Sequence, residues 1–374
     1  MSFYIILTTI IFILAVLIRG PLTVELKRKS NSTFLHLDDF FLKICFAILF
    51  ILSAFRGITV GRDTKLYSRI FQILGNRGFS EQVSHNLSGY KGYRFLCRAV
   101  YVVFGNNFIV FNVIISAVTL GLLFKMIKIY SEDYYLSVIL LILMYTVYNS
   151  WNLSRQYCAI AIGTYAMELL LENKTIVSFF VFLLAISFHS TAAILIIIYF
   201  VKQIRWTKRR FIFFSMLILM STAFFTLLVR LFLYIFPRFS YLYAKQFNAG
   251  DFGSHFGGVA SGRKSIVSIL FLMIVIVTLA FVRSERLTKL WFFMAITMVS
   301  IIIGIVFRHY SAILRVQEYF NVICIISIPN MIEALFEDRT KRMFSKLMLV
   351  LIMLVPYIVQ LKENYSAIIP YTLY

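Results

Sequence analysis

Long apolar runs, separated by short polar stretches, dominate the chain. The runs approach twenty residues and show no strict alternation of apolar and polar positions, so they predict membrane-spanning α-helices and not the strands of a barrel. The candidate spans are about 3–18, 39–55, 107–124, 135–148, 152–171, 176–187, 190–201, 211–235, 266–282, 290–307, 312–329 and 344–360. We therefore expect an all-α fold, a polytopic transmembrane helical bundle with about 11–12 spans.

The composition supports a lipid environment. Of the 374 residues, 61% are hydrophobic and 14% are charged, which is too little charge to cover a soluble domain of this size. The formal net charge of +21 would suit nucleic acid or an anionic membrane. The basic residues are spread over loops and helix ends, however, so no nucleic-acid partner is expected and an anionic, lipid-linked ligand fits better. The four cysteines are far apart and predict no metal site.

The polar stretches give the organisation and the orientation. No repeat or linker divides residues 1–374, so we expect a single membrane domain with two polar outer loops, 56–93 and 236–265, and a short amphipathic interfacial helix over 94–105. With the N-terminus outside, the inner side receives a small majority of the basic residues. A single long span over 176–201 would reverse that bias. We therefore expect a broken or hairpin segment near His189, a form that membranes tolerate where it lines a protein-enclosed cavity.

Under this topology the unusual polar side chains gather on the outer side. They are Arg56, Arg62, Asp63, Arg155, His189, Arg238, Arg263, Arg308, His309 and Arg315. Excess arginine on the outer side opposes the usual insertion bias, and a bound anion is the simplest reason for keeping it there.

Two stretches in the first half of the chain could bind such an anion. The segment from Arg56 to Tyr67 contains Gly61, Arg62 and Asp63, and it fits either a ligand-binding loop or a capped helix start. Arg155 and Gln156 belong to a polar cluster with Asn152 and Ser154 at a helix N-terminus, where the dipole and a planar guanidinium both suit phosphate. Snorkelling of the arginine to the membrane surface is the structural alternative.

Further candidates follow in the second half. His189 lies in an apolar stretch and is either a packing residue or a general base. Arg315 shares a helix face with Glu318 and Tyr319, so it either pairs with Glu318 or binds a ligand. Residues 237–243 are aromatic and basic, which suits either sugar stacking or an interfacial belt. No Gly-rich phosphate loop, metal cluster or serine nucleophile elbow occurs, so no cofactor is expected.

Seven short motifs occur in a fixed order along the chain. They are Arg56…Gly61-x-Asp63-Thr64-x-x-Tyr67, Gly92-Tyr93, Gly105-Asn106-Asn107-Phe108, Arg155-Gln156-x-x-Ala159, Phe188-His189-Ser190-Thr191-Ala192, Arg238-x-Ser240-x-Leu242 and Arg315-x-x-x-Tyr319-Phe320. The ordered set, which covers about residues 40–330, resembles the EpsG family, related to the Wzy-type polymerases of O-antigen and capsular polysaccharide. One departure is Tyr90-Lys91-Gly92-Tyr93, where family members often carry an acid in a Glu-Pro-Gly-Tyr-like motif.

The resemblance implies a multi-pass glycosyltransferase of the bacterial inner (cytoplasmic) membrane, similar in architecture to GT-C-type membrane glycosyltransferases, with its active site facing the periplasm or exterior. Such an enzyme transfers a growing glycan from undecaprenyl pyrophosphate to an incoming lipid-linked repeat unit, without a metal or other cofactor. The implied partners are the undecaprenyl-pyrophosphate-linked oligosaccharide and the lipid bilayer. A chain-length regulator protein is a further candidate partner.

On this hypothesis each candidate residue has a role. Arg155, Arg308 and Arg315 bind the pyrophosphate and stabilise the charge that develops as the lipid carrier leaves. Asp63 and His189 are the candidates for the general base, and Arg62 orients Asp63. The remaining substrate-binding candidates are Arg56, Tyr67, Tyr93, Gln156, Arg238, Tyr241, Tyr243 and Tyr319.

Three rival functions use similar features. A flippase for lipid-linked oligosaccharide needs arginines along a path through both leaflets. An O-antigen ligase differs from the polymerase in its acceptor, which is lipid A core. A membrane-bound O-acyltransferase also uses an intramembrane histidine, but the sequence gives no support for the acyl-donor tunnel that it requires.

Overall fold

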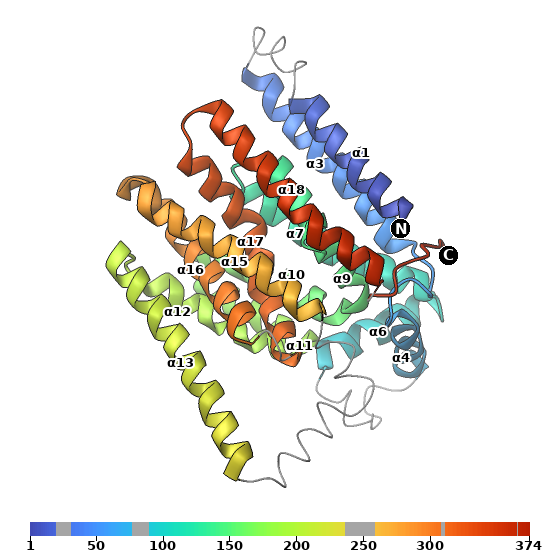
Figure 1. Cartoon of the computed structure of the whole chain (residues 1–374). Coiled ribbons are helices and arrows are strands. Elements are labelled where there is room, and N and C mark those ends of the chain that lie inside the picture. Colours follow the sequence, from blue (N-terminus) through green and yellow to red (C-terminus); the bar gives the residue numbers. More distant parts are fainter. Residues whose placement is uncertain (20–30, 77–89, 236–258, 308–310, 365) are drawn as a thin grey trace. The chain divides into compact units, whose positions relative to one another are not determined.

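The computed structural model describes the chain except for residues 20–30, 77–89, 236–258, 308–310 and 365 (Figure 1). Over these described residues the regular elements are helices, and a single isolated bridge joins Arg56 and Leu373. The helices are α1 (Ser2–Arg19), α3 (Asn31–Ala54), α4 (Thr64–Asn76), α6 (Lys91–Phe104), α7 (Phe108–Tyr130), α8 (Tyr134–Leu143), α9 (Thr146–Asn152), α10 (Ser154–Leu171), α11 (Thr175–Phe188), the 3₁₀ helix η1 (Ser190–Ile196), α12 (Ile197–Gln203), α13 (Lys208–Ile235), α15 (Val259–Phe281), α16 (Ser284–Val306), α17 (Ser311–Leu335) and α18 (Arg339–Glu363).

The lengths and the composition of these helices define a multi-pass membrane protein. In the described part of the chain, four helices are long and apolar enough to cross a membrane, and five if the bent pair α8 and α9 counts as one span. Further apolar helices of 10–17 residues include Thr175–Phe188 and Ser190–Gln203. Each predicted span overlaps at least one helix, so the all-α polytopic bundle is confirmed, while the expected number of 11–12 spans stays a prediction.

The chain divides into two compact units. Unit 1 contains Met1–Ile196 and Tyr357–Tyr374, and unit 2 contains Ile197–Pro356. The expectation of a single membrane domain stays a prediction.

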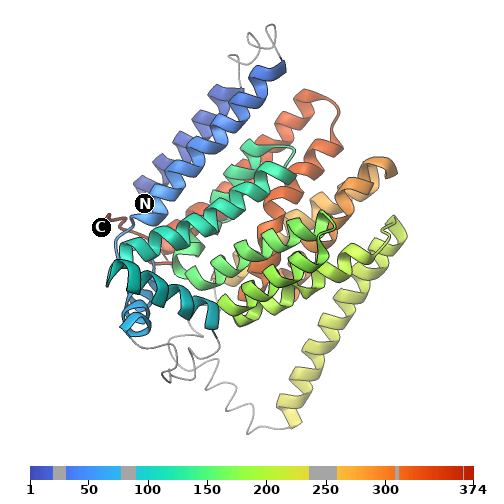
Figure 2. The same ribbon diagram turned by 180° about the vertical axis from the view of Figure 1, so that it is seen from behind.

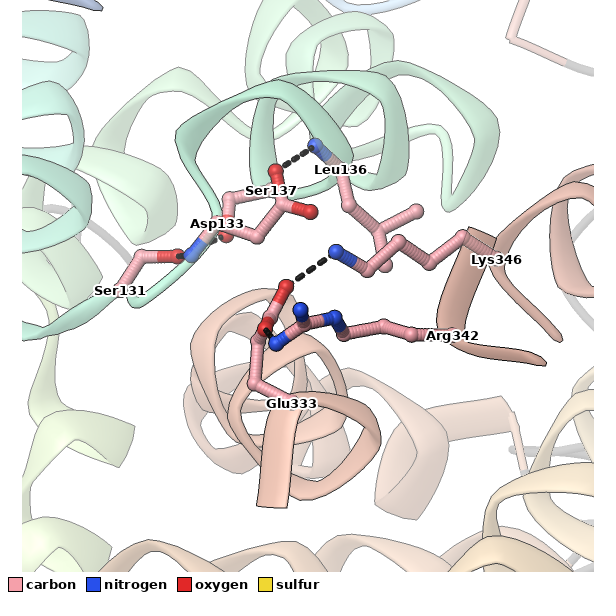
Figure 3. A network of polar contacts seen from close by, with 7 residues as sticks. All are labelled: Ser131, Asp133, Leu136, Ser137, Glu333, Arg342 and Lys346. Atoms are coloured by element: carbon pink, nitrogen blue, oxygen red, sulfur yellow. Dashed lines mark hydrogen bonds and ion pairs between the residues drawn. The ribbon is translucent and has the colours of Figure 1, made fainter. Parts of the chain in front are cut away.

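One end of unit 1 carries paired charges. In the last part of α7, Lys125 Nζ lies 2.8 Å from a carboxylate oxygen of Glu168, and Lys128 Nζ lies 3.0 Å from one of Asp39. Lys174 Nζ lies 2.8 Å from a carboxylate oxygen of Glu172. Asp133 begins α8 by accepting a hydrogen bond from Leu136 N at 3.1 Å (Figure 3). Because α3 begins and α10 ends here, Arg56, which follows α3, and Arg155, at the start of α10, lie at the opposite end of the unit.

Two short helices lie at that opposite end. The predicted polar loop 56–93 contains α4 over Thr64–Asn76, and the predicted amphipathic helix is confirmed as α6. The two helices lie side by side at the end of α3, as the view from behind shows (Figure 2). The start of α4 follows Asp63 directly, as the capped-helix alternative predicted.

Two breaks interrupt the spans of unit 1. The break near His189 is confirmed: α11 ends at Phe188, His189 is extended, and η1 returns along α10, with Leu195 against Gly163. The break between α8 and α9 was not predicted. There Tyr145 adopts a left-handed conformation (φ 65°) and the helix bends by 45°. Tyr145 is completely buried, and its ring lies 6.2 Å from that of Tyr357, a tertiary contact that helps to offset the strain.

Residues 366–374, here called the tail segment, are bound to the loop after α3. Backbone N–H groups of Gly57, Gly61 and Arg62 donate to carbonyls of the tail segment at 2.8–3.0 Å, and Tyr374 N donates to Phe55 O. Gly61 has φ 96°, a conformation that favours glycine. The tail segment therefore holds the loop in one conformation.

Tyr371 anchors the tail segment, and its removal should destabilise unit 1. Its ring stacks on Phe3 at 4.7 Å, and its hydroxyl donates to Leu52 O at 2.9 Å. We expect Tyr371→Ala to cost about 2–3 kcal/mol in unfolding free energy and Tyr371→Phe about 1 kcal/mol. Thermal unfolding of the detergent-purified protein measures both. An unchanged melting temperature for Tyr371→Ala would contradict this role.

Unit 2 is built on close packing of α15, α16 and α17. Gly304 of α16 lets Ser268 and Gln317 approach so closely that a Cβ would overlap both, and Gln317 Nε2 donates to Ser300 O at 2.9 Å. Where α17 meets α18, Glu333 binds both Arg342 and Lys346, as Figure 3 shows.

Candidate functional site

Arg155 lies within a group of aromatic rings at the N-terminus of α10. Its Cζ is 4.4 Å from the centroid of the Tyr90 ring, 5.4 Å from that of Tyr93 and 5.6 Å from that of Tyr67. These distances are those of cation–π contacts, which hold a guanidinium without neutralising it. We call Arg155 and these three tyrosines the Arg155 cluster.

The hydrogen-bonding capacity of Arg155 is not used up by the protein. Within the described ranges, its Nε and Nη1 atoms are buried and have no hydrogen-bond partner. Leu153, which precedes α10, provides no side-chain cap to the helix. A buried guanidinium without an acceptor is costly, and both it and an uncapped helix N-terminus favour an anion.

Tyr67 and Tyr93 come from the two short helices, and Tyr90 is the N-cap residue of α6. Tyr67 lies one turn into α4, and its backbone N–H donates to Asp63 O at 2.9 Å. Tyr93 is completely buried on α6, with its ring 6.5 Å from that of Tyr67. Burial raises the pKa of Tyr93 well above its ordinary value, so the phenol stays neutral. The Tyr93 ring therefore presents an uncharged π face.

Gly92 sets the distance between α6 and the His189 break. A Cβ on Gly92 would overlap Ser187 Oγ and lie 3.0 Å from the Phe188 ring. With glycine at this position, the His189 ring lies 5.6 Å from that of Tyr90. His189 is half-buried, and its Nδ1 lies 2.7 Å from Thr191 Oγ1. Tyr90 therefore contacts both Arg155 and His189.

Arg56 has a different environment. It is 2% exposed, its Nη1 donates to Ser53 O, and its guanidinium lies 6.0 Å from the Trp151 ring. Burial lowers its pKa to about 10, so it is still charged at neutral pH. A cation there stabilises the C-terminal end of α3. This geometry indicates a structural role for Arg56. The predicted role of Arg56 in substrate binding stays a prediction.

The other candidates of unit 1 are Arg62, Asp63 and Gln156. Arg62 is exposed and its backbone N–H is held by Ser366 O at 3.0 Å, while Asp63 is half-buried directly before α4. Gln156, next to Arg155, is 3% exposed. The direct contacts within the Arg155 cluster and with His189 join residues that the sequence had placed in four separate motifs.

The remaining candidates lie elsewhere. Arg315 is half-buried in α17 of unit 2, and Tyr319 of the same helix is 1% exposed. Arg238, Tyr241, Tyr243, Arg308 and His309 lie outside the described residues, as does the side chain of Arg263. The predicted meeting of Arg155, Arg308 and Arg315 therefore stays a prediction.

Sequence reasoning missed two parts of the site. Tyr90 was treated as a departure from the family motif, yet its ring is the nearest of the three to Arg155. The position of Tyr90, two residues before Gly92 in the family motif, could have indicated that Tyr90 belongs to the site. The tail segment was missed because nothing in its sequence indicates that it binds residues more than 300 positions earlier.

A helical bundle in which several helices are long and apolar enough to cross a membrane defines the class: a multi-pass membrane protein. The family model of EpsG matches residues 39–373. The chain belongs to the EpsG family, and it is therefore a Wzy-like polymerase of polysaccharide biosynthesis in the general sense. No curated protein and no solved structure matches the chain.

Proposed function

We propose that this protein polymerises oligosaccharide repeat units in the bacterial inner membrane, with the Arg155 cluster binding the diphosphate of the undecaprenyl-pyrophosphate-linked donor. The observation that carries the proposal is the Arg155 guanidinium, held by three rings, with two buried nitrogens lacking an acceptor among the described residues. Oxygen atoms of a diphosphate would supply charged acceptors.

The proposed reaction is a glycosyl transfer. A hydroxyl of the acceptor sugar attacks the anomeric carbon of the donor glycan, and the bond from that carbon to the diphosphate oxygen breaks. The carrier leaves with the bonding electrons, and Arg155 stabilises the charge that develops on the diphosphate. The hydroxyl proton passes to a general base, for which His189 and Asp63 are the candidates.

The position of His189 supports its assignment as the base. It contacts Tyr90, which also contacts Arg155, so both groups lie beside one aromatic ring. A neutral imidazole can accept a proton, and the contact of Nδ1 with Thr191 orients the ring. Tyr90 is half-buried, and on this proposal its ring also stacks on a sugar.

The charge distribution of unit 1 favours polymerase over flippase. The lysines at one end pair with Asp39, Glu168 and Glu172, whereas the buried Arg56 and the half-buried Arg155 lie at the other end, each with at least one buried nitrogen that lacks a partner within the described ranges. A flippase needs such groups along a path through both leaflets. The active site would face the periplasm or exterior.

Turnover of a purified lipid-linked repeat unit tests the proposal. We expect the wild-type protein to extend the glycan and release undecaprenyl pyrophosphate. His189→Ala should slow turnover by about 10²–10⁴-fold if His189 is the base, with Asp63→Asn tested in parallel. Gel mobility of the glycan and chromatography of the released lipid measure the two products. Transfer to lipid A core, or movement of the lipid without glycan extension, would replace the proposal by the ligase or the flippase.

A further inference from the structure

The pair of helices α4 and α6 is attached to the end of a membrane span. Phe71 of α4 packs against Phe108 and Phe111 in the first turn of α7, with ring centroids 5.9 and 5.0 Å apart. Arg98 of α6 donates to Gly75 O of α4. Since α7 is long and apolar enough to span the membrane and begins at Phe108, the pair lies at the level where that span ends.

Both helices expose large apolar side chains, and contact of these side chains with water is unfavourable. Leu66 and Ile73 of α4 are 54% and 46% exposed, and Phe95 and Val102 of α6 are 62% and 65% exposed. In each helix the two side chains are seven residues apart, so they form one stripe along the helix. Neither helix is among those long and apolar enough to span the membrane.

A basic stripe runs beside the apolar stripe of α4, and one exposed lysine lies at the start of α6. Lys65 and Arg69 lie one turn apart on α4, and both are exposed next to Leu66 and Ile73. Lys91 on α6 is exposed one turn before Phe95. Lys65, Arg69 and Lys91 form no ion pair with the residues that the structure describes, in contrast to Lys128 and Lys174 at the other end of unit 1.

We propose that α4 and α6 form an interfacial platform whose apolar stripes enter the acyl region and whose exposed basic residues, Lys65, Arg69 and Lys91, bind anionic lipid headgroups. Apolar stripes bordered by basic ones, at the end of a span, are what a helix in the membrane interface requires. The occupant is the anionic leaflet surface. This binding also gives a physical reason for the basic residues between 56 and 98 on the side that the insertion bias disfavours, and it does not depend on the reaction.

Depth measurements on adjacent residues test the apolar half. The natural cysteines Cys45, Cys97, Cys158 and Cys324 are buried, so an introduced cysteine can be labelled selectively. Ile73→Cys and Gln72→Cys, both at exposed positions, would carry a bimane label in nanodiscs of phosphatidylcholine and phosphatidylglycerol. Nitroxides on the acyl chains close to the headgroup should remove most of the fluorescence at position 73 and little at position 72. An unquenched label at position 73 would overturn the proposal.

Lipid selectivity tests the basic half. We expect the wild-type protein to retain spin-labelled phosphatidylglycerol in preference to spin-labelled phosphatidylcholine. Lys65→Gln/Arg69→Gln should reduce that preference by about fivefold for each charge at low salt, whereas the matched Lys128→Gln/Lys174→Gln should leave it unchanged. Both pairs are exposed, and an unaltered melting temperature verifies folding. Equal preference in the two double variants would refute headgroup binding by α4.

Discussion

Replacement of Arg155 by alanine is expected to abolish polymer formation while the protein remains inserted in the membrane. The substitution removes the guanidinium that faces three tyrosine rings and carries two buried nitrogens without acceptors among the described residues. Loss of one preorganised donor to a developing oxyanion costs about 10²–10³-fold in rate. We therefore expect turnover of the lipid-linked repeat unit to fall by at least about 100-fold.

Two further variants separate charge from geometry at this position. Arg155→Lys keeps the positive charge but loses the planar fork, so it should recover only part of the rate. Arg286→Ala is the control, because this exposed arginine of unit 2 pairs with Glu337 at 2.8 Å and lies outside the site. Polysaccharide gels, membrane fractionation and turnover in vitro measure the outcome. A normal ladder from inserted Arg155→Ala protein would exclude this residue from the mechanism.

Gly92→Ala should have the second largest effect, because the added methyl group must occupy the space of Ser187 Oγ. The collision moves α6 away from the end of α11, which separates Tyr90 from His189 and shifts Tyr93 relative to Arg155. Misplacement of catalytic groups by about 1 Å can cost about 10²-fold in rate. We expect turnover to fall by at least about tenfold, with a loss of stability of about 1–3 kcal/mol.

A compensating substitution tests the cause. Ser187→Ala removes the atom that the new methyl group meets, so the Gly92→Ala/Ser187→Ala double variant should recover much of the lost activity. Gly121→Ala on α7 is the matched control, since a Cβ at this position meets nothing within 4 Å. Turnover and thermal unfolding are measured for all four variants, the two single substitutions, the double variant and the control. Additive defects in the double variant would argue against steric displacement of α6.

The contrast between Arg155 and Arg56 illustrates how far sequence can lead toward a site. Both arginines follow a polar break next to an apolar span, and the sequence assigned both to the substrate. Both guanidiniums have a nitrogen without a partner among the described residues, but Arg155 lies among three tyrosine rings, whereas Arg56 lies at the end of α3 and donates to Ser53 O. Whether a guanidinium faces a ligand site or a helix C-terminus depends on neighbours distant in the chain, which no local motif encodes.

The helix α4 and the break at Tyr145 also show where prediction from the sequence fails. Residues 56–93 are polar enough to predict a loop, yet Thr64–Asn76 form α4, because one face of this stretch is apolar and finds partners on α6 and α7. The left-handed Tyr145 also follows from burial among other tyrosines, since the local sequence contains neither glycine nor proline. By contrast, the break at His189 was predictable because the distribution of basic residues required it.

The sequence alone determined the class of the fold and the positions of most of the long helices, because the length and apolarity of a membrane helix are local properties that lipid imposes segment by segment. Its ordered motifs also indicated the EpsG family, which the match over residues 39–373 established. Only the tertiary structure decided that Tyr90 and His189 adjoin Arg155 and that the tail segment holds the loop after α3. These contacts join residues tens to hundreds of positions apart, and their geometry follows from how helices pack, which the local pattern of apolar residues does not specify.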